Sequence, residues 1–195
     1  MEILTNRPLA RRAWKRLAVA LAALLLSWTA PVAAQRVTAP ALKAAFLFNF
    51  VNFIEWPADV LAPGQPLSLC VVGDTAVADA LEQTIKGRSI DNHALTLSVM
   101  KATDTPVLQC HLVYVGGSDA KRLDQILFAL IGTSIFSVGD GDRFAETGGV
   151  AQLIVENGRV RFAVNMDAAR RAHLKISSKL LSLATILKDP TDVPR

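Results

Sequence analysis

The sequence predicts an α/β fold, a three-layer sandwich in which helices cover both faces of a mostly parallel sheet with an antiparallel hairpin at one edge. Short apolar runs that end at glycine alternate with segments of helical length, which is the pattern of parallel strands joined by helices. Towards the carboxyl end, two apolar runs flank Glu156-Asn157-Gly158. Asn-Gly is a strong hairpin signal because both residues accept a positive φ.

The first 34 residues are predicted to be a signal peptide. A basic segment precedes the apolar run Leu17–Trp28, which is short for a membrane span, and small residues follow for cleavage near Ala34. An uncleaved membrane anchor is the alternative. Residues 35–188 then form a single domain, and residues 189–195 form a loose tail because two prolines interrupt them.

The charge of the exported chain argues against nucleic-acid binding. The full chain contains 21 basic and 17 acidic residues. Cleavage after residue 34 removes five basic residues and one acidic residue, which leaves 16 of each. A nucleic-acid-binding domain generally carries a basic surface, so we expect no nucleic-acid partner.

The first half of the domain contains two predicted helices and three predicted strands. The first helix spans residues 41–56, since Thr38 can cap it and Pro57 ends it. Asp74 caps the second helix, which runs to about Ile85. The strands are the apolar or alternating runs at residues 67–72, 94–100 and 112–115.

The second half continues this alternation and ends in a long predicted helix. Gly116-Gly117-Ser118 leads into a helix at residues 119–131, and a turn-rich loop at residues 139–149 precedes the hairpin. One helix is predicted over residues 167–187, where apolar side chains recur at helical spacing from Ile176 to Leu187. The strands of this half are residues 134–138, 150–155 and 159–164.

Aromatic side chains are concentrated in residues 46–57, F-L-F-N-F-V-N-F-I-E-W-P. Phe46, Phe50 and Phe53 recur at helical spacing, so we expect them to form the inner face of the first helix. Burial of one such ring contributes about 2–3 kcal/mol. Phe48 falls outside this face and is a candidate for a dimer or partner contact.

Of the two cysteines, Cys70 belongs to a predicted strand, and Cys110 opens the run C-H-L-V-Y-V-G-G, which contains another. An exported protein meets an oxidising compartment, and cysteines on neighbouring strands lie at a separation that suits a disulfide. Closing this loop stabilises the fold by roughly 3–4.5 kcal/mol in the chain-entropy model. Two buried free thiols, or a redox-active pair, are the alternatives.

The sequence carries no recognisable catalytic, metal-binding or cofactor-binding motif. The turn V-V-G-D-T-A-V after the first strand has one glycine and lacks the Lys-Ser/Thr of a phosphate-binding loop. His93, His111 and His173 have no second ligand at metal-binding spacing. No serine lies in a G-x-S-x-G motif. We therefore expect a binding protein and not an enzyme, with no metal and no cofactor.

Basic residues on the last predicted helix are candidates for partner binding. Arg171, Lys175 and Lys179 follow one another at intervals of four residues, and Arg170 lies beside them. A docking surface for an acidic partner is one interpretation of this stripe. An ordinary solvated helix face is the other.

Several motifs together resemble the YfiR family of bacterial periplasmic regulators. They are K-A-A-F-L-F-N-F-V-N-F-I-E-W-P at residues 43–57, V-G-G-S at 115–118, T-G-G-V at 147–150 and V-N-M-D-A-A-R-R-A-H-L-K-I-S-S-K-L-L at 164–181. The resemblance covers essentially the whole exported chain. The first and last motifs are the most specific, and their family residues are Asn49, Phe50, Glu55, Trp56, Pro57, Ser177, Ser178 and Lys179.

This resemblance implies a periplasmic protein, often a homodimer, that represses a membrane-bound, YfiN-like diguanylate cyclase by binding the cyclase's periplasmic sensor region. Release would raise cyclic-di-GMP and favour biofilm. A YfiB-like outer-membrane lipoprotein is a further implied partner, and Cys70 and Cys110 match the positions of a family disulfide. The alternative function is periplasmic small-molecule binding at the carboxyl edge of the sheet, near Gly73-Asp74 and Gly116-Gly117-Ser118.

Overall fold

The computed structural model describes residues 37–100, 109–117, 120–156 and 159–188. Four predictions therefore concern residues outside the described part of the chain. They are the signal peptide, the first residue of the helix at 119–131, the turn residues Asn157-Gly158 and the carboxyl-terminal tail.

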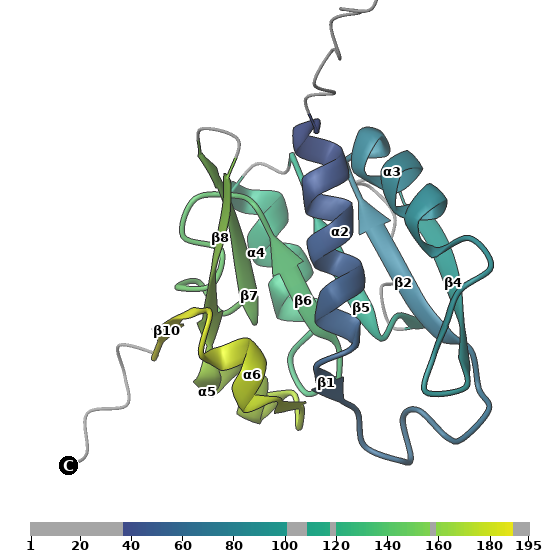
Figure 1. The fold of residues 1–195 in the computed structure, drawn as a ribbon. Coiled ribbons are helices and arrows are strands. Elements are labelled where there is room, and N and C mark those ends of the chain that lie inside the picture. Colours follow the sequence, from purple (N-terminus) through teal and green to yellow (C-terminus); the bar gives the residue numbers. More distant parts are fainter. Residues whose placement is uncertain (1–36, 101–108, 118–119, 157–158, 189–195) are drawn as a thin grey trace, which may run out of the picture. The chain divides into compact units, whose positions relative to one another are not determined.

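A mixed sheet of eight strands runs through the described residues in the order β10-β8-β7-β6-β5-β2-β4-β3 (Figure 1). The β7–β8 hairpin and the β3–β4 pair are antiparallel, and the other neighbours are parallel. The predicted fold class is confirmed. The strands are β2 (Leu67–Val72), β3 (Ser89–Ile90), β4 (His93–Met100), β5 (Leu112–Val115), β6 (Phe136–Gly139), β7 (Ala151–Glu156), β8 (Arg159–Asn165) and β10 (Thr185–Leu187).

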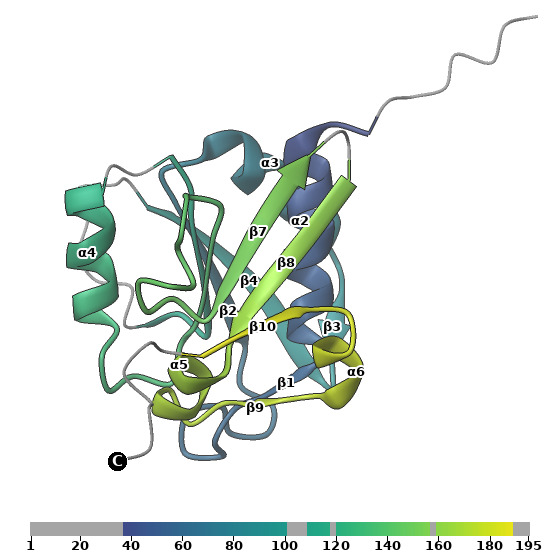
Figure 2. The same cartoon turned by 90° about the vertical axis from the view of Figure 1, so that its left-hand side faces the viewer.

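Helices cover both faces of this sheet, as predicted. Leu69 of β2 points to the face on which α2 (Ala39–Val51) and α3 (Thr75–Ile85) pack. Cys70, the next residue along the strand, points to the other face and shares a core with α4 (Ala120–Ala129). Figure 2 shows α2 and α4 on opposite sides of the sheet.

The first predicted helix forms, but it ends at Val51 and not at Trp56. Thr38 caps its amino end, as expected. After Val51 the chain turns, and Ile54–Glu55 form the short strand β1, which pairs antiparallel with β9 (Lys175–Ile176). This pairing requires extended backbone, so a partner from the other end of the chain overrides the local helical pattern.

The aromatic inner face of α2 is confirmed at Phe46 and Phe50. The Phe50 side chain is fully buried, and its ring centroid lies 5.7 Å from that of Phe136 and 5.1 Å from that of Phe162. The ring centroid of Phe46 lies 6.0 Å from that of Phe162, also in an edge-to-face arrangement. These edge-to-face contacts join α2 to the sheet. Phe53 lies beyond the helix end and is only partly buried.

The prediction of one helix over residues 167–187 is wrong. His173 has a φ of 55°, in the left-handed region, and the Leu174 N–H donates to the Ala169 carbonyl at 3.0 Å. This is a typical helix carboxyl-terminal arrangement, and it ends the helix that begins near residue 167. The segment forms α5 (Met166–Arg171), β9, α6 (Ser178–Leu181) and β10.

Strand pairing explains why the long helix does not form. Lys175–Ile176 pair with β1, and Thr185–Leu187 pair in parallel with β8. Hydrogen bonds to these strands replace the helical ones. The apolar residues consequently do not share one face, since Leu180 is buried while the Leu183 side chain is 76% exposed.

Candidate functional site

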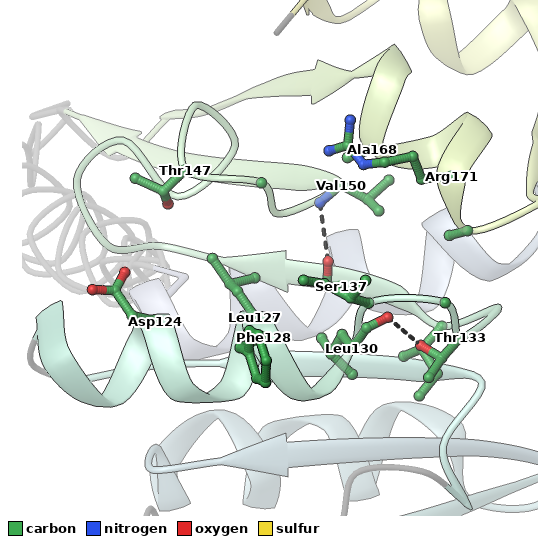
Figure 3. Close-up of a pocket in the computed structure, with 15 residues that line it drawn as sticks. Asp124, Leu127, Phe128, Leu130, Thr133, Ser137, Thr147, Val150, Ala168 and Arg171 are labelled. Carbon is green, nitrogen blue, oxygen red and sulfur yellow. Dashed lines mark hydrogen bonds between the residues drawn. The ribbon is translucent and has the colours of Figure 1, made fainter. Parts of the chain in front are cut away.

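A pocket of about 340 Å³ lies on the α4 side of the sheet (Figure 3). Leu127 of α4 and Leu130, just after α4, form one wall of the pocket. Val150, before β7, and Ala168 of α5 form the opposite wall. Its volume is within the range of pockets that bind small molecules or partner side chains.

The polar side chains between these walls are bonded to the main chain. The buried Ser137 hydroxyl accepts a hydrogen bond from the Val150 N–H at 3.0 Å. The Thr133 hydroxyl donates to the Leu130 carbonyl at 2.7 Å. The surface of the pocket is therefore mainly apolar, and such a surface suits the binding of an apolar group.

Charged side chains mark the two ends of the pocket. Asp124 of α4 lies at one end of the pocket, and the Arg171 side chain reaches from α5 over Val150 at the other end (Figure 3). A guanidinium group beside an apolar hollow suits an occupant that joins an apolar group to a carboxylate.

Two large apolar side chains line the rim of the pocket and face solvent. The side chain of Phe128, on α4, is 77% exposed, and that of Ile131, just after α4, is 73% exposed. Exposed apolar surface around a hollow indicates a protein-interaction surface. We call Phe128, Ile131, Arg171 and the pocket the α4–α5 surface.

The residues of the predicted basic stripe do not lie on one helix. Arg171 lines the pocket, but Arg170 pairs with the buried carboxylate of Asp167. Lys175 lies in β9, where its ammonium is 4.0 Å from Glu55. Lys179 is exposed on α6. The interruption at His173 separates these residues, so only Arg171 lies at the pocket.

Phe48, the predicted contact residue of the first helix, lies on the opposite face of the sheet from this pocket. It is partly buried and packs against the α2 core. The Arg88 guanidinium lies 5.0 Å from the centroid of its ring, at the distance of a cation–π contact. The α4–α5 surface and Phe48 are therefore separate locations.

The two most specific motifs meet at the β1–β9 pair. The Ser177 N–H donates to the Phe53 carbonyl at 2.9 Å, and the Ser177 hydroxyl caps α6. The Trp56 indole N–H donates to the His111 carbonyl at 3.2 Å. Ser177 therefore joins the two ends of the domain, and Trp56 joins the segment after α2 to the start of β5. Of the other motif residues, Phe50 is in the core, Pro57 begins a turn, and Asn49 and Ser178 are exposed.

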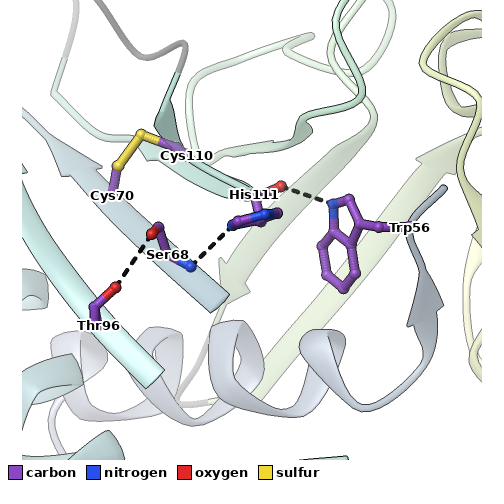
Figure 4. Close-up of a disulfide and its surroundings, with 6 residues drawn as sticks. All are labelled: Trp56, Ser68, Cys70, Thr96, Cys110 and His111. Carbon is purple, nitrogen blue, oxygen red and sulfur yellow. Dashed lines mark hydrogen bonds between the residues drawn. A yellow bond between two sulfur atoms is a disulfide. The ribbon is translucent and has the colours of Figure 1, made fainter. Parts of the chain in front are cut away.

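Cys70 and Cys110 form the predicted disulfide, with 5.9 Å between their Cα atoms (Figure 4). Cys70 lies in β2, and Cys110 lies shortly before β5, which pairs with β2 in parallel. Both residues are buried. The alternative of two free thiols is excluded.

His111, next to Cys110, is built into the same corner of the sheet (Figure 4). Its Nδ1 accepts a hydrogen bond from the Ser68 N–H at 3.0 Å. Its Nε2 lies 3.3 Å from the Val60 carbonyl oxygen. Burial lowers the pKa of His111 below its usual 6.5, although the hydrogen bond to the Val60 carbonyl opposes this shift, and His93 adds a small effect that lowers it. Folding therefore favours the neutral form of the His111 ring.

Sequence reasoning missed a group of four polar side chains at the carboxyl edge of the sheet. The Lys43 ammonium, from α2, forms an ion pair with Asp140, after β6, and lies 3.8 Å from Asp74, after β2. It lies 5.9 Å from the ring centroid of Tyr114, in β5. Burial raises the pKa of Tyr114 strongly, and the charge of Asp140, its hydrogen bond with Tyr114 and the charge of Asp74 raise it further. We call these four residues the Lys43 cluster.

A metal centre is not formed by the described residues, since no three of their His, Cys, Asp and Glu side chains converge on one point. None of the helices in the same part of the chain has the length and apolar character that crossing a bilayer requires.

Comparison with known proteins identifies the class. The model of the YfiR/HmsC-like family matches residues 40–185, and the chain belongs to this family. It is a regulatory family of periplasmic proteins that act in cyclic-di-GMP signalling.

A solved structure with a similar fold is that of a conserved domain protein from Vibrio cholerae O1 biovar El Tor strain N16961. The TM-score is 0.50 at 14% sequence identity, over 78% of this chain and 60% of that protein. The present chain thus covers less than two thirds of that protein, and the likeness concerns the fold alone.

Proposed function

We propose that this protein represses an inner-membrane diguanylate cyclase by binding the cyclase's periplasmic sensor region. Through this contact it keeps cytoplasmic cyclic-di-GMP low and limits biofilm formation. Membership of the YfiR/HmsC-like family supports the class of function. The exposed apolar rim of the α4–α5 surface, at Phe128 and Ile131, is the observation that carries the proposal of a protein contact.

The contact needs an apolar anchor and an ion pair. Phe128 and the pocket behind it can bury an apolar side chain of the sensor region, and aromatic residues commonly dominate such contacts. Arg171 can pair with a neighbouring carboxylate in a bidentate geometry. We therefore expect the sensor region to present an apolar residue beside an acidic one.

Repression requires that this protein distinguishes two states of the cyclase. A binding protein shifts an equilibrium only by its difference in affinity for the two states. A near-complete switch needs a difference of about 10⁴-fold. The protein should therefore bind the inactive sensor region much more tightly than the active one.

A YfiB-like outer-membrane lipoprotein and a second copy of the chain are further proposed partners, on the basis of the family resemblance. A lipoprotein that relieves repression would compete for the surface that binds the cyclase. Light scattering of the purified protein measures whether the homodimer exists.

Deletion of the gene, followed by complementation, tests the proposal. We expect deletion to raise intracellular cyclic-di-GMP and the wild-type gene to lower it again. Phe128→Asp and Arg171→Glu should fail to restore repression, because they remove the anchor and reverse the charge. Val99→Asp and Lys86→Glu are matched controls at exposed positions elsewhere and should restore it.

Two results would contradict different parts of the proposal. Unchanged cyclic-di-GMP in the deletion strain would exclude the regulatory function. Full repression by Phe128→Asp and Arg171→Glu, at wild-type periplasmic levels, would exclude the α4–α5 surface as the contact.

A further inference from the structure

Strand β4 lies at one side of the sheet, beyond β2, and most of its outer edge is open (Figure 1). The short strand β3 pairs only with His93 and Ala94 of β4. Among the described residues, no strand pairs with the outer side of residues 95–100. Proteins usually protect such an edge with a charged residue or a proline, but residues 94–100, A-L-T-L-S-V-M, contain neither. The edge can therefore accept another strand.

The main-chain groups of Leu95, Leu97 and Val99 point to this open edge. The Gly73 N–H donates to the Met100 carbonyl at 3.3 Å, so the main chain of Met100 bonds towards β2. In a parallel pair, every second residue of a strand bonds to the same neighbour. The three residues that alternate with these consequently direct their N–H and C=O groups away from β2, where a further strand can pair with them.

The side chains along this edge form one apolar row and one hydroxyl row. Leu95 and Leu97 pack partly against the core on the α3 face of the sheet. Val99 follows them on the same face, and its side chain is 58% exposed. Thr96 and Ser98 are exposed on the opposite face. A strand that pairs here would cover the exposed apolar surface of Val99.

We propose that two copies of this protein pair through β4 as antiparallel strands, with Ser98 opposite Ser98 of the second copy. Leu97 then lies opposite Val99 of the second copy, and these two residues exchange two main-chain hydrogen bonds. Two-fold symmetry repeats the same contact on the other side of the axis. Apolar side chains meet apolar ones and hydroxyl groups meet hydroxyl groups, which favours pairing. Because residues 94–100 carry no charge, two identical edges meet here without repulsion within the strands.

Strand β3 determines the register of this pairing. A two-fold axis at Leu97 would bring Met100 of the second copy to the place that Ser89 occupies beside Ala94. An axis at Ser98 pairs residues 96–100 of each copy, and their outer side is open among the described residues. The edge is therefore self-complementary in one register.

This inference rests on the homodimer proposed above and assigns its surface. It leaves the α4–α5 surface uncovered, because Ser137 of the pocket belongs to β6, and β5 and β2 lie between β6 and β4 in the sheet. A variant that cannot dimerise through β4 should consequently still bind the cyclase. The expected repression by Val99→Asp agrees with this separation of the two surfaces.

Cysteine cross-linking of the exported chain tests the register. Residues that face each other in a non-hydrogen-bonded antiparallel pair have Cα atoms about 4.5 Å apart, within the range of a disulfide. Ser98→Cys should therefore give a disulfide-linked dimer on mild oxidation, measured on a non-reducing gel. Thr96→Cys is the matched control on the same exposed face and should not cross-link, because the two copies of residue 96 would lie about 13 Å apart. Cys70 and Cys110 are already bonded to each other.

Sedimentation velocity over a range of protein concentrations measures the dimer without a cross-link. We expect the wild-type chain to dimerise. Val99→Asp should raise the dissociation constant of the dimer by at least about tenfold, because it places a carboxylate opposite Leu97 in a contact that excludes water. Leu183→Asp replaces another exposed apolar side chain, close to β10 at the other edge of the sheet, and should leave the constant unchanged.

Three results would overturn the proposal. They are a wild-type protein that is monomeric over the whole concentration range, cross-linking of Ser98→Cys that is no faster than that of Thr96→Cys, and a dimer that Val99→Asp leaves intact. The last two results, with a wild-type dimer present, would exclude this surface and keep the homodimer. All of these measurements use the purified protein without the cyclase, so they are independent of cyclase repression.

Discussion

His111 and Ser68 form a reciprocal pair of hydrogen bonds. The His111 main-chain N–H donates to the Ser68 carbonyl at 2.8 Å, and the Ser68 N–H donates to Nδ1 of the His111 ring at 3.0 Å. Because Nδ1 accepts, the ring carries its proton on Nε2, which faces the Val60 carbonyl. The neutral imidazole is thus part of the hydrogen bonding of the sheet, next to the disulfide.

The stability of the protein should fall as the pH falls below about 6.5, the usual pKa of histidine. Burial lowers the pKa of His111 in the folded state, so in this range the unfolded chain binds a proton more readily than the folded chain. The loss of stability begins near the pKa that His111 has in the unfolded chain, and it is complete below the pKa that His111 has in the folded protein. Urea unfolding at a series of pH values measures it.

Two substitutions test whether His111 or another titrating group causes this loss of stability. His111→Asn should flatten the dependence between pH 7 and pH 5, since it removes the proton-binding group. His173→Asn is the matched control, at an exposed left-handed position that Asn tolerates, and should keep the slope. An unchanged slope in His111→Asn would show that another group causes it.

Removal of the disulfide should lower the free energy of unfolding by about 4 kcal/mol, from the entropy of a 40-residue loop in the unfolded chain. Urea unfolding with and without reductant measures this change. A Cys70→Ala/Cys110→Ala variant is the control, because reductant should then have no further effect. A loss below about 1 kcal/mol would argue against the chain-entropy account.

The central strands could be predicted because local sequence specifies them. Leu67–Val72 and Leu112–Val115 are apolar runs that no helical periodicity explains, and the structure forms both. The short strands β1, β9 and β10 could not be predicted. They have two or three residues each and exist only because a partner distant in sequence pairs with them.

The candidate sites were predictable to different degrees. Arg171 was predicted as a contact residue from its place on a long helix that does not form, yet it lies at the pocket. The exposed Phe128 lies on a predicted helix, but its exposure depends on how that helix packs. The Lys43 cluster joins four segments, and only Asp74 lies in a turn that the sequence marks as a ligand-binding edge. The sequence feature that could have indicated this cluster is the presence of polar residues directly after buried strands.

The two phenylalanines of α2 should differ in their contribution to stability. Phe50→Ala should lower the free energy of unfolding by about 3–5 kcal/mol, because it leaves a cavity beneath Phe136 and Phe162. Phe48→Ala should cost less than about 2 kcal/mol, since its ring is only partly buried and Arg88 covers it. Urea unfolding compares them, and equal losses would contradict this assignment of the inner face.

Position 173 distinguishes the observed chain path from a continuous helix. His173 has a φ of 55°, so His173→Gly should be more stable than His173→Ala by about 1 kcal/mol. In a helix interior the order is reversed, and Ala is favoured by about 1 kcal/mol. Gln83, exposed in α3, is the matched control and should show the helical order. Urea unfolding of the four variants measures both differences, and a helical order at residue 173 would mean that α5 continues into the following segment.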